Sequence, residues 1–438
     1  MKSNIEWREE EQKAITQWKE PDWGSYLGEE EADLAEMALR SGALVRARKI
    51  KEVTDLLRMV LAYAVSNWSL RMVAIWGTLR GIACISDVGL LYRFRRCQGL
   101  LGRLVVRVLQ RRNETLQAMN GVRVRLIDAT VITQPGSSGT DWRVHAVFDL
   151  GEMCLSGLAV TDAHGGEKLT RFPAQPGEIR IGDRAYGLAS NLAPLLAALI
   201  AFVVRIGWNR IQLQTMEATR LDLIAWLKSV QTTCERFVSL PTLPGTPLRL
   251  IAAPLPAAEA QKAREKIVRQ AKKKGKVAHP HSYLAAGYVI LLTNLPADFW
   301  PTERVLWLYR LRWQIELQFK HLKGLLTLDH LAAQDPCLVQ TFLFGKLLAA
   351  LLLDQCVHRT TQLQPDWFAS LRRPVSLWRL HALLWLAIRD LILGSFSLAL
   401  ILKALPLLQR YLRDAPRRRT QQLAWARSIL SRLQAVPC

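Results

Sequence analysis

The sequence has few cysteines for its length and does not group them. Seven cysteines stand singly along 438 residues, with no CxxC pair and no cluster of cysteine with histidine. This scatter indicates neither a zinc site nor a disulfide framework. Unpaired cysteines are typical of a reducing compartment, so we expect a cytoplasmic protein.

The sequence also lacks an obvious signal peptide or membrane-spanning segment. Its first residues, MKSNIEWREEEQK, contain no apolar stretch of the kind found in a signal peptide. The one uncharged run long enough to span a bilayer is 185–204, which includes polar residues and Pro194. Its end is β-branched and aromatic, and the whole run predicts a short buried helix followed by a buried strand.

Acidic residues are scarce after the first forty positions. The chain has a net charge of +22 and a pI near 10.1. Residues 1–40 hold eleven acids against five bases, a net of −6 that leaves +28 on the rest. This excess predicts an anionic partner, nucleic acid first and an acidic membrane surface second. The acidic leader, residues 1–40, is either a solubilising tail or a segment that shields the basic surface.

The N-terminal part of the basic body reads as helical. Apolar residues recur at i, i+3 and i+4 over residues 50–112, with Ser86 or Asp87 as a candidate N-cap. Bases along the later helices suit a helical DNA-binding domain, which we assign to 41–118. They equally suit a helical bundle with a solvated face.

The pattern then changes to strands. VRVRLIDATVIT (122–133) alternates and is rich in β-branched residues, and RVHAVFDL and CLSGLAVTDA follow it. EIRIGDRAYG (178–187) is a fourth strand, and a helix at 188–198 leads to a fifth strand, FVVRIG. Three consecutive strands and then alternation with helix predict an α/β fold with a mixed sheet.

A different composition interrupts this sheet at 207–286. Strand-like pieces are separated by PTLPGTP, and QKAREKIVRQAKKKGK (261–276) carries eight bases to one acid. We interpret this stretch as a β-rich insertion with a basic segment. GYVILLTNLP (287–296) returns to a buried strand, a long helix begins at Pro301 and Thr302, and helices fill 331–438.

One helix segment, YRLRWQIELQFKHLKG (309–324), places a single acid among bases. At 100° per residue, one arc of about 60° holds Tyr309, Arg312, Glu316 and Lys323. The opposite side is predicted to be buried and holds Leu311, Ile315, Leu322 and Leu325. By periodicity alone, this polar line is better explained by i,i+4 ion pairs on a solvated face.

Two further carboxylates stand at or near strand ends, where α/β sheets bind ligands. Asp128 follows VRVRLI and Asp183 follows EIRIG, although acids are disfavoured inside strands. Together with Glu316 they would repel one another unless divalent cations lay among them, and Mg²⁺ prefers such oxygen ligands. The alternative is that both aspartates only form turns.

Three motifs resemble those of DDE transposases of the insertion sequence 4 family. LIDATVI around Asp128 and IGDRAYG around Asp183 resemble the strands that carry the first and second catalytic aspartates. The family's YREK motif, Y-x2-R-x3-E-x6-K, is matched without a spacing error by Tyr309, Arg312, Glu316 and Lys323. The resemblance covers roughly residues 50–330. It implies an RNase H-like catalytic domain over 119–206 and 287–330, interrupted by the insertion.

The resemblance also implies a mechanism. Asp128, Asp183 and Glu316 would ligate two Mg²⁺ ions, for which Mn²⁺ can substitute. Water, and later a DNA 3′-hydroxyl, would attack the phosphodiester at the end of the element. The partner would be double-stranded DNA, both terminal inverted repeats and target, bound by a homodimer in a synaptic complex at the nucleoid, with no membrane involved.

Further residues are implied or suggested as DNA contacts. The resemblance gives Tyr309, Arg312 and Lys323 as phosphate contacts, and Arg184 beside Asp183 is another candidate. The basic segment with Lys272, Lys273 and Lys274 is either a contact to the DNA backbone or a mobile solvated loop.

One position departs from the family pattern. Some relatives carry a tryptophan, which stacks on a flipped base during hairpin formation, where this chain has Val289. Tyr288 alternates to the other strand face, and Trp208 is a more distant candidate. The overall prediction is a cut-and-paste DNA transposase. The alternatives are a transposase-derived DNA-binding protein without catalysis and a protein that binds membrane surfaces through its basic helices.

Overall fold

The computed structural model describes residues 27, 29–116, 122–175, 177–363 and 377–394. These residues divide into two compact units. One contains the residues up to Leu100 and from Ala387 onward, and the other is Leu101–Leu386. Residues 1–26 of the predicted leader and residues 395–438 of the predicted C-terminal region lie outside the described residues.

The first unit is helical, as predicted. Its helices up to residue 100 are α3 (Glu31–Arg40), α4 (Val53–Ser66), α5 (Leu70–Leu79), α6 (Asp87–Phe94) and the start of α7 (Gln98–Thr115). Ser86 is the N-cap of α6, because its hydroxyl accepts a hydrogen bond of 3.1 Å from the Gly89 amide. The last ten residues of the predicted acidic leader form α3, which buries Leu34 and Met37.

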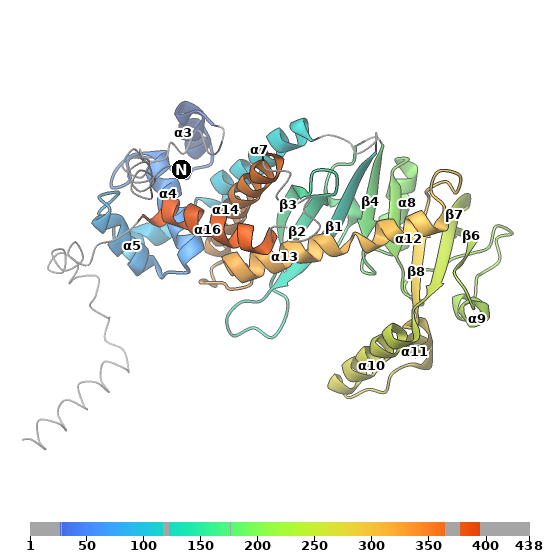
Figure 1. The fold of residues 1–438 in the computed structure, drawn as a ribbon. Helices are drawn as coiled ribbons and strands as arrows, with labels where there is room; N and C mark the ends of the chain where they lie inside the picture. Colours follow the sequence, from blue (N-terminus) through green and yellow to red (C-terminus); the bar gives the residue numbers. More distant parts are fainter. Residues whose placement is uncertain (1–26, 28, 117–121, 176, 364–376, 395–438) are drawn as a thin grey trace, which may run out of the picture. The chain divides into compact units, whose positions relative to one another are not determined.

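The second unit is built on an eight-stranded sheet in the order β3-β2-β1-β4-β5-β8-β7-β6 (Figure 1). β1 pairs antiparallel with β2 and parallel with β4, and β4 pairs parallel with β5. This arrangement confirms the predicted RNase H-like mixed sheet. The strands are β1 (Arg123–Ile132), β2 (Trp142–Asp149), β3 (Cys154–Asp162), β4 (Glu178–Gly182), β5 (Ala201–Arg205), β6 (Cys234–Leu240), β7 (Leu243–Pro254) and β8 (Tyr288–Thr293).

The strands of the insertion extend this same sheet. β6 and β7 form an antiparallel hairpin, β7 pairs with β8, and β8 pairs antiparallel with β5. The basic segment is not a loop, because most of it lies in a helix, α10, that buries only Ala260. The helices of the insertion are α9 (Leu223–Ser229), α10 (Ala257–Lys273) and α11 (Pro280–Ala285).

Helices pack against the strands that carry the predicted acids (Figure 1). α8 (Ala189–Ala197) lies against β5 and buries Leu192 and Leu195 in the main hydrophobic core. α12 (Thr302–Arg310) lies against β5, α13 (Trp313–Leu326) against β1 and β2, and α14 (Pro336–Leu363) against β3. The remaining described helices are the 3₁₀ helix η1 (Leu169–Arg171) and α16 (Leu377–Leu393).

Two segments bear on the membrane prediction. Residues 185–204 form α8 and β5, which confirms the predicted short helix and buried strand. One described helix, Pro336–Thr360, is long and apolar enough to cross a membrane, and 78% of its apolar window is buried inside the protein. A core helix passes the same test of length and composition, so this helix is weak evidence for a membrane span.

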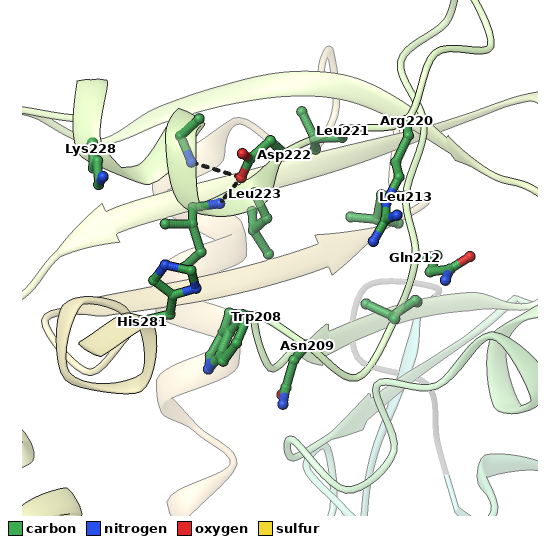
Figure 2. A pocket seen from close by; sticks show the side chains of 13 residues that line it. Trp208, Asn209, Gln212, Leu213, Arg220, Leu221, Asp222, Leu223, Lys228 and His281 are labelled. Carbon is green, nitrogen blue, oxygen red and sulfur yellow. Dashed lines mark hydrogen bonds between the residues drawn. The ribbon is translucent and has the colours of Figure 1, made fainter. Parts of the chain in front are cut away.

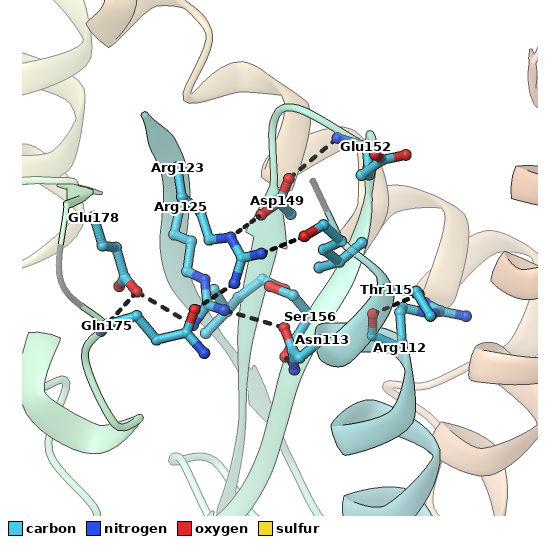
Figure 3. A network of polar contacts seen from close by, with 12 residues as sticks. Arg112, Asn113, Thr115, Arg123, Arg125, Asp149, Glu152, Ser156, Gln175 and Glu178 are labelled. Atoms are coloured by element: carbon cyan, nitrogen blue, oxygen red, sulfur yellow. Dashed lines mark hydrogen bonds and ion pairs between the residues drawn. The ribbon is translucent and has the colours of Figure 1, made fainter. Parts of the chain in front are cut away.

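Buried arginines at the start of β1 and β4 are neutralised by one glutamate. Glu178 is 1% exposed and lies 3.4 Å from Arg125 (Figure 3) and 2.6 Å from Arg180. Burial lowers the pKa of Arg125, and the charge of Glu178 opposes this shift. Because a buried charge without its partner is costly, the strands that lead to Asp128 and Asp183 depend on Glu178 staying in place beside these arginines.

We predict that Glu178→Gln destabilises the protein strongly. The change leaves two buried guanidinium groups without their counter-charge, which typically costs about 3–5 kcal/mol in the free energy of unfolding. Urea denaturation followed by circular dichroism would measure it. Glu265→Gln on the exposed side of α10 is the control and should change this free energy by less than about 0.5 kcal/mol. Equal stability of the two variants would contradict the structural role of Glu178.

Candidate active site

The parallel pairing of β1 with β4 brings the two predicted aspartates side by side. The pairing aligns Val124 with Ile179 and Leu126 with Ile181. Two residues further along each strand, the same alignment reaches Asp128 in β1 and Asp183 directly after β4. Neighbouring strands lie about 4.8 Å apart, so the two acids are adjacent at the end of β4.

Each aspartate is oriented by a backbone amide. The Asp128 carboxylate accepts a hydrogen bond of 2.8 Å from the Ala129 amide. The Asp183 carboxylate accepts one of 2.7 Å from the Ala185 amide, inside a turn closed by the Tyr186 amide and the Asp183 carbonyl. The predicted turn geometry is therefore present at Asp183, and the register of β1 and β4 places this turn beside Asp128.

The surroundings of the Asp128 carboxylate disfavour its ionised form. Burial, above all, raises its pKa to about 7. The Ala129 amide and the Arg312 guanidinium oppose this rise, while the negative charges of Asp183 and Glu167 add to it. The site therefore penalises the ionised form of Asp128 unless a cation approaches it.

The predicted continuous helix through residues 309–323 is wrong. α12 ends at Arg310 and α13 begins at Trp313, and the turn between them has i→i−3 hydrogen bonds, including one of 3.1 Å from the Arg312 amide to the Tyr309 carbonyl. Such a turn winds about 3.0 residues per turn instead of 3.6, so it rotates the residues that follow. Leu311 is consequently 42% exposed, although it was predicted to be buried.

The other residues of the predicted apolar side lie in α13, after the break. Ile315 and Leu322 are buried, as predicted, and Leu325 is half-buried. Phe319 and Leu326 complete the buried side of α13. The helical pattern therefore predicted the buried side correctly in α13 and incorrectly at Leu311, where the helix breaks.

Arg312, from the break between the helices, connects the third predicted acid to the first. Its guanidinium lies 3.6 Å from the Asp128 carboxylate and forms an ion pair with the Glu316 carboxylate. The Tyr309 ring lies beneath it, with the guanidinium carbon 5.8 Å from the ring centroid. Three of the four YREK-type residues thus gather at Asp128, by way of Arg312.

The remaining predicted contacts lie further out. Lys323 is two turns along α13 from Glu316, about 10 Å at 1.5 Å per residue. Arg184 is exposed directly after Asp183. The exposed residues Lys272, Lys273 and Lys274 lie at the C-terminal end of α10, in the insertion.

Two residues near the acids were missed from the sequence. Glu167 is half-buried, and Asp183 contributes, after burial, to the rise of its pKa. Arg205 lies at the end of β5, where burial lowers its pKa and neighbouring Arg184 adds to the effect. Neither residue lies in a recognisable motif, and only the folded sheet brings them to Asp183.

The donor set suits a divalent cation, although the structure contains no ligand. All candidate donors are carboxylate oxygens, which hard cations such as Mg²⁺ prefer, and the charge of Asp183 adds to the rise of the Asp128 pKa. Among the described residues, no three His, Cys, Asp or Glu side chains are gathered closely enough to hold an ion. Glu316 is instead turned toward the Arg312 guanidinium, which supplies positive charge at the site.

Trp208, a predicted candidate for stacking on a base, lies at a pocket of about 600 Å³ (Figure 2). Its ring stacks on His279 with centroids 5.1 Å apart, and His281 meets it edge-on at the same distance. Its indole nitrogen donates a hydrogen bond of 3.1 Å to the Ser282 hydroxyl. One face of the indole is therefore already covered by a histidine.

A smaller cavity of about 230 Å³ extends from Trp208 toward the acids, and its lining includes Arg184 and Arg205. Tyr288 also lines it, together with Ile290, whereas Val289 is not among its lining residues. This is the alternation expected along β8.

Comparison with known proteins agrees with this arrangement. The protein family described as "Transposase DDE domain" matches residues 120–352. The chain is 36% identical over 352 residues to the InsL transposase of insertion sequence element IS186A from Escherichia coli (strain K12), covering 78% of this chain and 94% of that protein. It is 35% identical to the transposase of element IS421 from Escherichia coli, again covering 78% of this chain and 94% of that protein.

Among solved structures, a piggyBac transposase synaptic complex with hairpin DNA superposes with a TM-score of 0.41 at 9% identity, over 88% of this chain and 77% of that chain. The match of the DDE domain to more than half of the sequence, and the identity to InsL over nearly all of its length, assign the family. This chain belongs to the DDE transposases of bacterial insertion sequences.

Proposed function

We propose that this transposase moves its insertion sequence by cut-and-paste chemistry of the insertion sequence 4 type, with Asp128, Asp183 and Glu316 as its catalytic acids. The observation that supports this most is the register of β1 and β4, which sets Asp128 beside Asp183. The ion pairs of Arg312 with Asp128 and Glu316 link the third acid to them.

In this proposal the three carboxylates hold two Mg²⁺ ions, for which Mn²⁺ can substitute. The bound ions would lower the pKa of water and stabilise the charge that develops on the phosphodiester oxygens. The chain's own residues orient the DNA: Tyr309, Arg312 and Lys323 bind phosphates near the end of the element, and Arg184 extends this contact. Hydrolysis frees a DNA 3′-hydroxyl, which then attacks the target DNA.

Arg312 changes partner in this scheme. In the structure its guanidinium is bound to Asp128 and Glu316. A guanidinium binds phosphate and carboxylate with the same planar pair of donors, so a DNA phosphate can take it over. Release of Arg312 would then leave Glu316 free to bind a cation, which couples loading of the site to the presence of DNA.

The remaining features fit DNA as the substrate. The charge of +22 favours a polyanion, and α10 presents exposed lysines at its end. We propose that Lys272, Lys273 and Lys274 contact the DNA backbone and that two copies of the chain pair the terminal inverted repeats in a synaptic complex. We place this activity at the nucleoid, in the cytoplasm.

We predict that Glu316→Gln, Asp128→Asn and Asp183→Asn each abolish DNA cleavage. Each change removes one anionic ligand and keeps the shape of the side chain, so cleavage should fall by roughly 10³-fold or more. The measurement is cleavage of a duplex that carries a terminal inverted repeat, in Mg²⁺, with binding followed by gel mobility shift. Binding should persist.

Glu303→Gln, at an exposed position of α12, is the matched control and should cleave like the unchanged protein. Undiminished cleavage by Glu316→Gln would refute the assignment of the third acid. Specific binding without any cleavage by the unchanged protein would favour the alternative, a transposase-derived DNA-binding protein.

We also predict that replacing Lys272, Lys273 and Lys274 together by glutamine weakens DNA binding uniformly across sequences. A plot of log K for DNA binding against log salt concentration falls with a steepness of about 0.9 per phosphate contact. Loss of three contacts should therefore make this plot less steep by up to about 2.7. Binding titrations over a range of salt concentrations measure this slope. The triple arginine variant keeps the charge and should keep the slope, and an unchanged slope in the glutamine variant would exclude α10 from the interface.

A further inference from the structure

Glu167 lies on a segment, residues 163–168, that the surrounding protein holds firmly between β3 and η1. Arg143 donates hydrogen bonds to the carbonyls of Ala163 (2.9 Å) and Gly165 (3.2 Å). The amide group of Asn191 donates one of 3.1 Å to the Glu167 carbonyl. The backbone position of Glu167 is therefore fixed by donors from β2 and α8.

The same amide places Glu167 against the turn that carries Asp183. The Asn191 side-chain nitrogen also lies 3.3 Å from the Tyr186 carbonyl, so one group bridges the two segments. The Tyr186 amide in turn closes the turn on the Asp183 carbonyl at 3.2 Å. The turn is also closely packed against the strand before it: a Cβ added at Gly182 would lie 2.9 Å from Tyr186 and 3.1 Å from Leu169.

The Glu167 side chain has no structural partner to explain it. It is half-buried, yet no ion pair or side-chain hydrogen bond joins its carboxylate to another residue in the described part of the chain. This is unexpected in a chain with a net charge of +22. Burial raises the pKa of Glu167, and the charge of Asp183 adds to the rise, while the charges of Arg143 and Arg210 oppose it.

A second buried polar group lies in the turn that follows Asp183. Tyr186 is 0% exposed, and its hydroxyl has no hydrogen-bond partner among the described residues. Burial raises the pKa of this hydroxyl, and the negative charges of Asp128, Glu167 and Asp183 raise it further. A buried hydroxyl without a partner is costly, so this one indicates a group that the site takes up.

We propose that Glu167 is a fourth carboxylate of the cation site, an oxygen ligand that acts with Asp128 and Asp183, and that the Tyr186 hydroxyl donates a hydrogen bond to the ligand carboxylates once the cation is bound. The proposal rests on the proposed function. Like charges hold the carboxylates apart without a cation, and the three side-chain torsions of Glu167 let its carboxylate turn inward when a cation neutralises them.

The test is Glu167→Gln in the full-length protein, with Mn²⁺ binding measured by electron paramagnetic resonance and thermal unfolding measured in EDTA and in Mg²⁺. A ligand role predicts Mn²⁺ affinity lowered about 10-fold or more. It also predicts a melting temperature in EDTA that is equal to or above that of the unchanged protein, because a repelling charge has been removed. The rise in melting temperature on adding Mg²⁺ should shrink.

A merely structural role predicts the opposite pattern. In that case the melting temperature of Glu167→Gln falls equally in EDTA and in Mg²⁺, and Mn²⁺ affinity stays unchanged, and this result overturns the proposal. The control is Glu303→Gln, which should match the unchanged protein in every measurement.

Tyr186→Phe tests the hydroxyl separately. Removing a buried hydroxyl without a partner should leave the melting temperature in EDTA unchanged or raised, while Mn²⁺ affinity falls several-fold. Unchanged Mn²⁺ affinity would refute the role of the hydroxyl.

Asp128→Asn separates this inference from the proposed function. If Asp128→Asn loses Mn²⁺ affinity and Glu167→Gln does not, only the role of Glu167 is refuted. If Asp128→Asn retains both Mn²⁺ affinity and cleavage, the proposed catalytic acids themselves are refuted.

Discussion

The parallel pairing of β1 with β4 is the constraint on which the rest of the site depends. It brings Asp128 and Asp183 to neighbouring positions, and the charge of Asp183 adds to the rise that burial causes in the pKa of Asp128. The buried Glu178 network stabilises the beginnings of the same two strands. The ends of the two strands can then carry Asp128 beside Asp183, because the contacts of Glu178 lie at the other end of the strands, away from the site.

Positive charge near these acids is the second requirement, and the structure meets it with Arg312. This side chain binds Asp128 and Glu316 and rests on the Tyr309 ring. An arginine is suited to this place because its guanidinium stays charged when it is partly buried and binds two carboxylates at once. The arrangement also explains why no three acids are gathered closely among the described residues: Glu316 is oriented toward the guanidinium.

Much of the fold and part of the site could be predicted from sequence. Alternation and β-branched residues marked β1 correctly, and the end of EIRIG marked Asp183. The break at Leu311 could not be predicted, because neither proline nor glycine stands there to signal it, and the helical pattern continues across it. Glu167 was missed for another reason: it lies in no motif, and only the folding of residues 163–168 against the Asp183 turn brings it near.

The sheet also explains how the chain returns toward Asp128 after an insertion of about eighty residues. β8 pairs antiparallel with β5, aligning Val203 with Thr293, so the chain returns to the sheet of β1 and β4 at a fixed register. α12 then lies against β5 and α13 against β1, and the turn at residues 311–312 redirects the helix between them. The position of Glu316 thus depends on the β5–β8 pairing and on this turn. β6, β7 and α10 lie beyond β8, so they can differ in length or charge without moving Glu316, the proposed third acid.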